Sequence, residues 1–309
     1  MSDAWKPKGW IAILLGLILQ PFVFLYVNKL KVFFLYLLVV ICSALLDMNL
    51  QATATESIWY KDIYFSSFFM LICPAHAYWI TRNYNANDPR AWFASWWATS
   101  LTFISVFISI IGFRTFLIEP FTLPASSMAP TLDKGVQILV SKLGYGNYRY
   151  LGIQIHKTKV SAEVKRGDVV VFQYPQSPES DWVKRIIGLE GDRVIYRNKT
   201  VYIKKACDAQ SEECSGFEPL KSSSESVSPE GLIVRKEEID GQEYEVLLNE
   251  AQGDLTHHYF RQVGSGTGEW VVPEGHFFVL GDSRDNSLDS RFWGFVPKEN
   301  LIGKVVYSW

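Results

Sequence analysis

Four long apolar runs crowd into the first 118 residues of this 309-residue chain. They cover roughly residues 10–27, 31–47, 62–80 and 92–118, and each approaches the ~20 residues that an α-helix needs to cross a bilayer. Residues 1–118 hold eight Lys/Arg and five Asp/Glu, against 22 and 27 in the remainder. This pattern predicts a transmembrane anchor of about four helices over residues 1–118.

Two of these runs contain residues that are unusual inside a spanning helix. Gln20 and Pro21 interrupt the first run, and Pro74 and His76 lie in the third. Proline is tolerated in a membrane helix when neighbours satisfy the freed backbone groups. No small-x-small cleavage site follows the first run, so we expect a retained helix and not a cleaved signal peptide.

Positive charges in the short loops predict the orientation of the anchor. Runs one and two, and runs three and four, are joined by loops that carry two basic residues each: Lys29 and Lys31, and Arg82 and Arg90. The loop at 48–61 holds one basic residue, Lys61. Because basic loops face the cytoplasm, four crossings would place residue 119 onward on the extracytoplasmic side.

After residue 118 the pattern changes to short segments rich in Val, Ile and aromatic residues, such as "GDVVVFQY" and "GHFFVLGDS". Many short strands bounded by Gly, Pro or Asp are typical of an all-β domain. Long helices do not alternate with them, which disfavours a doubly wound α/β sheet. We therefore predict a β domain over 119–309, with a more polar inserted β/loop subdomain at about 200–270. The net charge of −2 gives no broad basic field, so we expect no nucleic-acid partner.

The four cysteines divide by context. Cys42 and Cys73 lie in apolar runs and are expected to be small hydrophobic residues. Cys207 and Cys214, in "CDAQSEEC", predict a short-loop disulfide if the compartment is oxidising; two unpaired thiols are the alternative. A second ligand pair with zinc spacing is missing, so we expect no metal site.

The serines of "PASSMAP", residues 124–130, need a base before either can act as a nucleophile. A Ser-His-Asp triad is disfavoured, because a G-x-S-x-G elbow is absent and the histidines lie in a membrane run, at strand edges or in polar loops: His76, His156, His257, His258 and His276.

A lysine offers another base. Lys184 lies in "DWVKRIIGLEGD" (181–192), and strand alternation places it on the same face as Trp182. Apolar surroundings lower the pKa of a lysine, and a neutral amine can take the proton of a serine. The alternative is a surface strand whose lysine reaches water.

A third stretch, "GDSRDNSLDSRFWGFVP" (281–297), alternates acidic and basic residues. The spacing of a calcium-binding hand is absent. Bidentate pairs could order such a loop, for example Asp289 with Arg291 or Asp282 with Arg284. An ordered loop of this kind could orient the ammonium group of Lys184.

Taken together, "PxxSMxPTL", "RGDVVVFxYP", "KRIIGLEGDRV" and the 281–297 stretch, in this order behind a membrane anchor, resemble bacterial type I signal peptidase (leader peptidase) over about residues 114–309. The resemblance implies a membrane-bound serine endopeptidase that removes N-terminal signal peptides after small residues. It implies a multi-pass protein of the bacterial inner membrane with a periplasmic catalytic domain. Its partners would be preprotein signal peptides and the lipid bilayer, and it would use no cofactor.

The same resemblance assigns roles to individual residues. Ser127 would be the nucleophile and Lys184 the general base. Ser287 would orient the lysine, and Asp289 and Arg291 would form a supporting ion pair. The residues expected to contact substrate are Phe121, Leu123, Pro124, Ala125, Met128, Leu132, Asp181, Trp182 and Val183.

Two positions depart from the family pattern. Ala125 stands where many Gram-negative members have a serine that completes the oxyanion hole, and Ser126 stands where glycine is common. The second oxyanion donor is therefore open: a backbone group, Ser126 or water. Ala125 and the extra helices also suggest an alternative function, a non-catalytic membrane protein that binds signal peptides. A self-cleaving Ser/Lys regulator is disfavoured, because four apolar runs replace the DNA-binding segment it would need.

Overall fold

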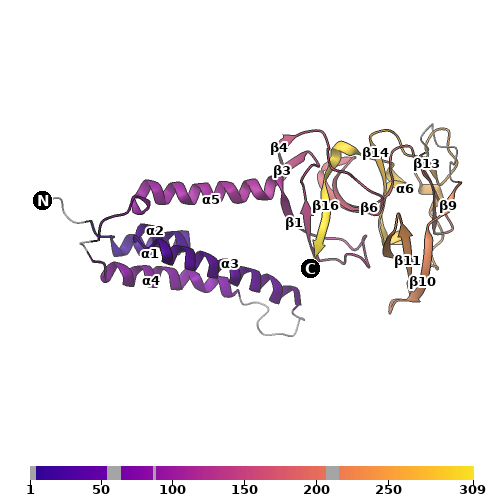
Figure 1. Ribbon diagram of the computed structural model, residues 1–309. Coiled ribbons are helices and arrows are strands. Elements are labelled where there is room, and N and C mark those ends of the chain that lie inside the picture. Colours follow the sequence, from indigo (N-terminus) through magenta and orange to yellow (C-terminus); the bar gives the residue numbers. More distant parts are fainter. Residues whose placement is uncertain (1–4, 54–63, 86–87, 207–215) are drawn as a thin grey trace. The chain divides into compact units, whose positions relative to one another are not determined.

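The computed structural model describes residues 5–53, 64–85, 88–206 and 216–309. The chain divides into two compact units, Met1–Ile110 and Ile111–Trp309 (Figure 1). Cys207 and Cys214 lie outside the described residues, so the disulfide stays a prediction.

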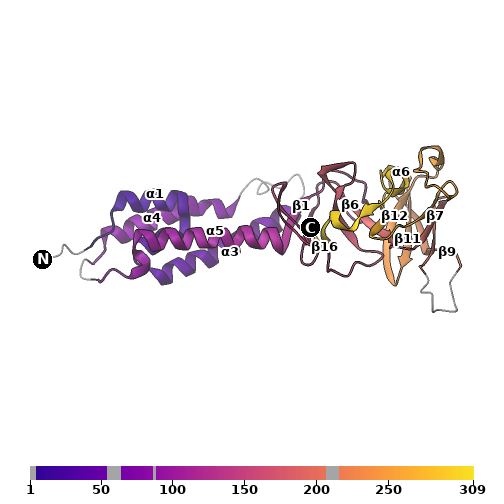
Figure 2. The same cartoon turned by 90° about the horizontal axis from the view of Figure 1, so that it is seen from above.

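The N-terminal unit is helical. Its helices are α1 (Gly9–Leu19), α2 (Val23–Tyr26), α3 (Leu30–Thr53), α4 (Phe69–Arg82) and the first part of α5 (Trp96–Phe116). Helices α1 and α4 lie side by side (Figure 2), because Gly16 carries no side chain: a Cβ there would lie 2.6 Å from Cα of Pro74. Three aromatic residues are buried between the helices: Phe22 of the 3₁₀ turn after α1, Phe24 of α2 and Phe33 of α3.

Three helical stretches of the described residues are long and apolar enough to cross a membrane: Gly9–Tyr26, Leu30–Leu50 and Trp96–Phe116. Pro21 breaks the first into α1 and α2, since proline cannot continue a helical hydrogen-bond ladder. The predicted run at 62–80 forms a 3₁₀ turn, Phe65–Phe68, and the 14-residue α4. This helix is shorter than a span requires, so the four-helix count stays a prediction.

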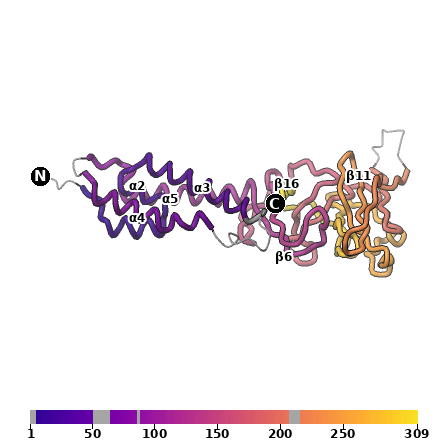
Figure 3. Tube along the Cα trace, turned by 90° about the horizontal axis from the view of Figure 1, so that it is seen from below, coloured from indigo at the N-terminus to yellow at the C-terminus, as the bar shows by residue number. Residues whose placement is uncertain are grey.

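The C-terminal unit is mostly β, as predicted. A seven-stranded antiparallel sheet has the order β1-β2-β16-β5-β6-β14-β15. Its strands are β1 (Ile118–Thr122), β2 (Gln137–Ser141), β5 (Val169–Tyr174), β6 (Ser177–Gly188), β14 (His276–Leu280), β15 (Val296–Pro297) and β16 (Leu301–Ser308). The C-terminal strand β16 is inserted between β2 and β5, so the chain's end lies beside the unit's first strands (Figure 3).

Three smaller sheets complete the unit. They are β13-β7-β8-β9, β10-β11-β12 and the hairpin β3-β4. The strands are β3 (Asn147–Tyr150), β4 (Ile153–Lys157), β7 (Arg193–Arg197), β8 (Thr200–Lys204), β9 (Glu218–Pro219), β10 (Lys221–Val227), β11 (Ile233–Ile239), β12 (Gln242–Leu248) and β13 (Glu269–Val271).

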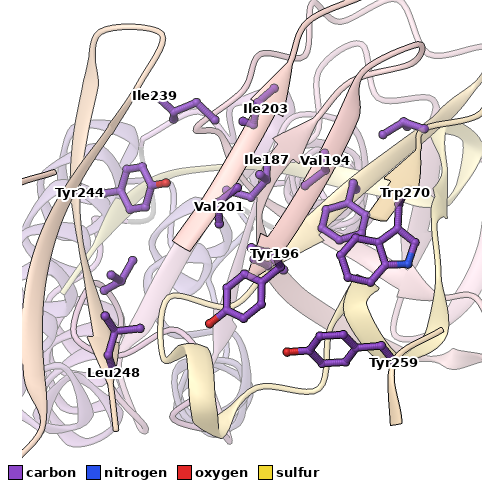
Figure 4. Close-up of a cluster of buried hydrophobic side chains, with 14 residues drawn as sticks. Ile187, Val194, Tyr196, Val201, Ile203, Ile239, Tyr244, Leu248, Tyr259 and Trp270 are labelled. Atoms are coloured by element: carbon purple, nitrogen blue, oxygen red, sulfur yellow. The ribbon is translucent and has the colours of Figure 1, made fainter. Parts of the chain in front are cut away.

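The segment predicted as a polar insertion contributes to a buried core. Tyr244 and Leu248 of β12 and Trp270 of β13 belong to one apolar cluster with Ile187 of β6 and Tyr196 of β7 (Figure 4). Its polar residues alternate with buried ones along β11 and β12, which is why the sequence looks loop-like. A separate subdomain at 200–270 stays a prediction.

Candidate active site

Strand β6 carries Lys184 through the middle of the large sheet, between β5 and β14. Lys184 pairs with Val170 of β5 and is 4% exposed. The neighbouring Trp182 stacks on Tyr174, with ring centroids 4.0 Å apart and planes at 4°. The lysine is thus enclosed by apolar strands and an aromatic stack, with its Nζ 5.5 Å from the ring centroid of Trp182.

Ser127 lies in a turn that two neighbours hold in place. Met128, 1% exposed, packs into an apolar cluster with Leu123 and Leu132. The carbonyl of Ser127 accepts a hydrogen bond from the N–H of Ser283 over 3.1 Å. The turn therefore exposes the hydroxyl of Ser127 while its backbone is anchored on both sides.

The structure brings Ser127 and Lys184 together from positions 57 residues apart. Lys184 Nζ donates a hydrogen bond to Ser127 Oγ over 2.7 Å and another to the carbonyl of Val183 over 3.0 Å. Within the described chain, no carboxylate lies within ion-pair distance of Nζ. Burial lowers the pKa of Lys184 to about 8, against the opposing effect of Asp289 and Asp282, whose charges raise it. A lysine in this position can lose its proton near neutral pH.

A cavity of about 600 Å³ opens over the pair. Besides Ser127, Lys184 and Ser287, its lining contains seven of the nine residues predicted to contact substrate: Leu123, Pro124, Ala125, Met128, Asp181, Trp182 and Val183. The other two lie elsewhere. Phe121 lines a separate hollow beside Glu119, and Leu132 is buried in the cluster under Met128.

Five further residues line the cavity: Leu255, Asp285, Asn286, Leu288 and Phe292. Four of them belong to the 281–297 stretch, so this motif could have identified them from the sequence. Leu255 comes from the segment predicted as an insertion, where nothing in the sequence distinguishes it from other loop leucines.

The 281–297 loop is ordered by buried ion pairs. Arg291 Nε donates to Asp289 Oδ1 over 2.8 Å, the predicted pair. The prediction that Asp282 pairs with Arg284 is wrong. Asp282 instead accepts two hydrogen bonds from Arg185 of β6, at 2.8 and 2.5 Å.

Arg284 is fully buried and pairs with Glu237 of β11. Burial alone would lower the pKa of the guanidinium, but the charge of Glu237 outweighs this effect, so the pKa is raised. The partners of Asp282 and Arg284 are 97 and 47 residues away in sequence. Local spacing could not reveal them, because the chain folds two distant strands against the loop.

Ser287 lies beside the dyad but does not form the predicted bond. Its hydroxyl is buried and makes no hydrogen bond within the part of the chain that the structure describes. Gly281 allows this close approach: a Cβ at Gly281 would lie 2.1 Å from Ser287 Oγ and 2.5 Å from the carbonyl oxygen of Ser127. The role of Ser287 in orienting the lysine stays a prediction.

Comparisons with known proteins find a matching family model and similar relatives. A family model described as "Signal peptidase, peptidase S26" matches residues 96–309. A protein named Signal peptidase I from Buchnera aphidicola subsp. Baizongia pistaciae is 36% identical over 245 residues, covering 68% of this chain and 76% of its own length. The protein of that name from Pseudomonas aeruginosa is 34% identical over 221 residues, covering 67% and 70%. A solved structure of a signal peptidase I from Enterococcus faecalis matches 47% of this chain and 98% of its own at 26% identity, with a TM-score of 0.25.

Proposed function

Because this chain belongs to the signal peptidase family, peptidase S26, and is therefore a serine peptidase, we propose that it is a membrane-bound endopeptidase that cleaves signal peptides from exported preproteins. Ser127 is the nucleophile and Lys184 the general base. The observation that carries this proposal is the 2.7 Å between Lys184 Nζ and Ser127 Oγ at the base of the cavity.

The chemistry follows from the protonation state of the amine. Neutral Lys184 takes the hydroxyl proton of Ser127 as the serine oxygen attacks the scissile carbonyl, and the ammonium then returns a proton to the leaving amine. Water attacks the acyl-enzyme by the same route and releases the serine. The N–H of Ser127 makes no hydrogen bond within the described residues, so it can donate to the developing oxyanion.

The cavity supports a substrate bound in extended form. Leu123, Pro124 and Ala125 form one wall, and Trp182 and Val183 form another. An extended peptide between them can bind as an added strand. Trp182 is fixed by its stack on Tyr174 and limits the space beside the dyad, which favours small side chains at the cleavage site.

The N-terminal helices support membrane attachment. We place the anchor at residues 1–118 and the catalytic domain at 119–309, with several crossings of the bacterial inner membrane. The basic pairs Lys29/Lys31 and Arg82/Arg90 favour cytoplasmic loops, and a catalytic domain on the periplasmic side would meet preproteins as they emerge.

The experiment is cleavage of a preprotein by the full-length chain in detergent or lipid vesicles. Ser127→Ala and Lys184→Ala should each lower turnover by at least about 10³-fold, since the two groups act as a unit. Exposed residues of the same type provide matched controls, Ser223→Ala and Lys298→Ala, which should leave turnover unchanged. Near-normal cleavage by either dyad variant would contradict the proposal, as would a wild-type protein that binds signal peptides without producing any product.

A further inference from the structure

We propose that the side-chain amide of Asn286 is the second donor of the oxyanion hole, tethered by the hydroxyl of Ser126; this inference rests on the proposed peptidase function. Ala125 stands where many Gram-negative members of the family have the serine that donates this second hydrogen bond. A methyl group cannot donate a hydrogen bond, so a second donor would have to come from another group.

Asn286 is a neutral side-chain donor in the cavity that is tethered to Ser126, the residue before the nucleophile. It lines the same cavity as Ser127 and Lys184. Its Nδ2 donates a hydrogen bond to Ser126 Oγ over 3.1 Å. A carboxamide nitrogen carries two hydrogens, and the second makes no hydrogen bond to any described residue. One N–H therefore fixes the amide, and the other is available to a substrate carbonyl.

The backbone around Asn286 is tied directly to the nucleophile. The N–H of Asn286 donates to the carbonyl of Ser283 over 3.0 Å, and the N–H of Ser283 donates to the carbonyl of Ser127 over 3.1 Å. The Asn286–Ser126 bond closes this path into a ring. The amide is thus held next to the serine whose attack creates the negative charge.

The turn is also fixed from its other side. Asp285 accepts hydrogen bonds from Lys199 Nζ at 2.6 Å and from the N–H of Asn249 at 2.7 Å. A donor that is held in place before the reaction stabilises an oxyanion without reorganising during it. Asn286 meets this condition although its own side chain is exposed at the rim, because Ser126 and the backbone of the turn restrain it.

Kinetics of single variants test the assignment. Asn286→Ala and Asn286→Leu should lower kcat by about 10²–10³-fold with KM changed only a few-fold, the cost of losing one oxyanion donor. Ser126→Ala, which removes only the tether, should cost about 10-fold or less. A large loss in Ser126→Ala with a small one in Asn286→Ala would overturn the assignment, because the donor would then be the serine hydroxyl.

A rescue and an inhibitor separate donation from structural support. Ala125→Ser, added to Asn286→Ala, should recover at least 10-fold of the lost kcat by placing a hydroxyl at the hole. A peptide aldehyde that forms a tetrahedral adduct with Ser127 should bind Asn286→Ala more weakly by the same factor as kcat/KM falls, while an uncleavable peptide binds equally well. Unchanged aldehyde binding would refute the role of Asn286.

The two proposals fail in different ways. If Ser127→Ala retained activity, the peptidase mechanism itself would be wrong. If Ser127→Ala were inactive but both Asn286 variants turned over at the wild-type rate, only the assignment of Asn286 would fall. Thermal unfolding of each variant checks that the fold is intact.

Discussion

Strand β6 buries one cationic side chain on each face, and within the described residues only one of the two is paired with a carboxylate. Lys184 and Arg185 are both buried, at 4% and 5% exposure. Arg185 faces Asp282, which accepts two of its hydrogen bonds, and it lies 4.0 Å from the ring centroid of Tyr244. Lys184 faces a hydroxyl and a carbonyl. One face compensates its charge fully, and the other does not.

This difference separates structural from catalytic demands. A buried guanidinium cannot be deprotonated, so it requires a paired carboxylate. The buried amine can give up its proton instead, and its surroundings make that easy. The paired face holds the 281–297 loop against the sheet, and the unpaired face carries the amine that we propose as the base. Substitutions on either face test this difference.

The largest effect is expected from Lys184→Arg. This change keeps the positive charge but removes the ability to act as a base, so turnover of a preprotein should fall by at least about 10³-fold. The reciprocal variant Arg185→Lys keeps a cation on the other face and should retain most activity while losing stability. Lys184→Arg within 10-fold of wild type would show that the residue acts only through its charge.

Removing the carboxylate on the paired face should unfold the protein more readily. Asp282→Ala leaves Arg185 buried without its partner, which should cost about 3–5 kcal/mol of unfolding free energy. The control is Glu299→Ala, whose partner Lys157 lies 3.6 Å away in an exposed pair; its cost should stay below about 1 kcal/mol. Equal losses in the two variants, measured by denaturant unfolding, would contradict the distinction.

The unpaired face should make stability depend on pH. The pKa of Lys184 is about 8 when folded and about 10.4 when unfolded. Between these values the unfolded chain binds more protons, so the free energy of unfolding rises with pH, by about 3 kcal/mol in total. Lys184→Met lacks this contribution. A stability difference between wild type and Lys184→Met that is constant from pH 7 to 10.5 would show that Lys184 is not buried as described.

Short motifs carried most of what the sequence could predict. Ser127 and Lys184 each lie in a compact motif, and strand alternation placed Lys184 on the same face as Trp182; the catalytic roles of both residues stay predictions. The change from apolar runs to short strands likewise predicted a mostly-β C-terminal half. These features are local, so a single sequence carries them.

Long-range partners were beyond sequence reasoning. The pairs Arg185–Asp282 and Arg284–Glu237 join the 281–297 loop to the distant strands β6 and β11. The sequence favoured a nearer partner for Asp282. The role we propose for Asn286 depends on a turn that brings it to Ser126, 160 residues earlier. The 14-residue length of α4 could not be predicted for a different reason. Apolar composition does not show where a helix begins.

The pH dependence of cleavage tests whether Lys184 is a buried amine that acts as a neutral base. In the full-length protein, kcat/KM for a preprotein should increase about 10-fold per pH unit on the acidic side and level off above about pH 8, where the amine has lost its proton. A value of kcat/KM that stays flat from pH 6 to 10 would show that Lys184 is not the base.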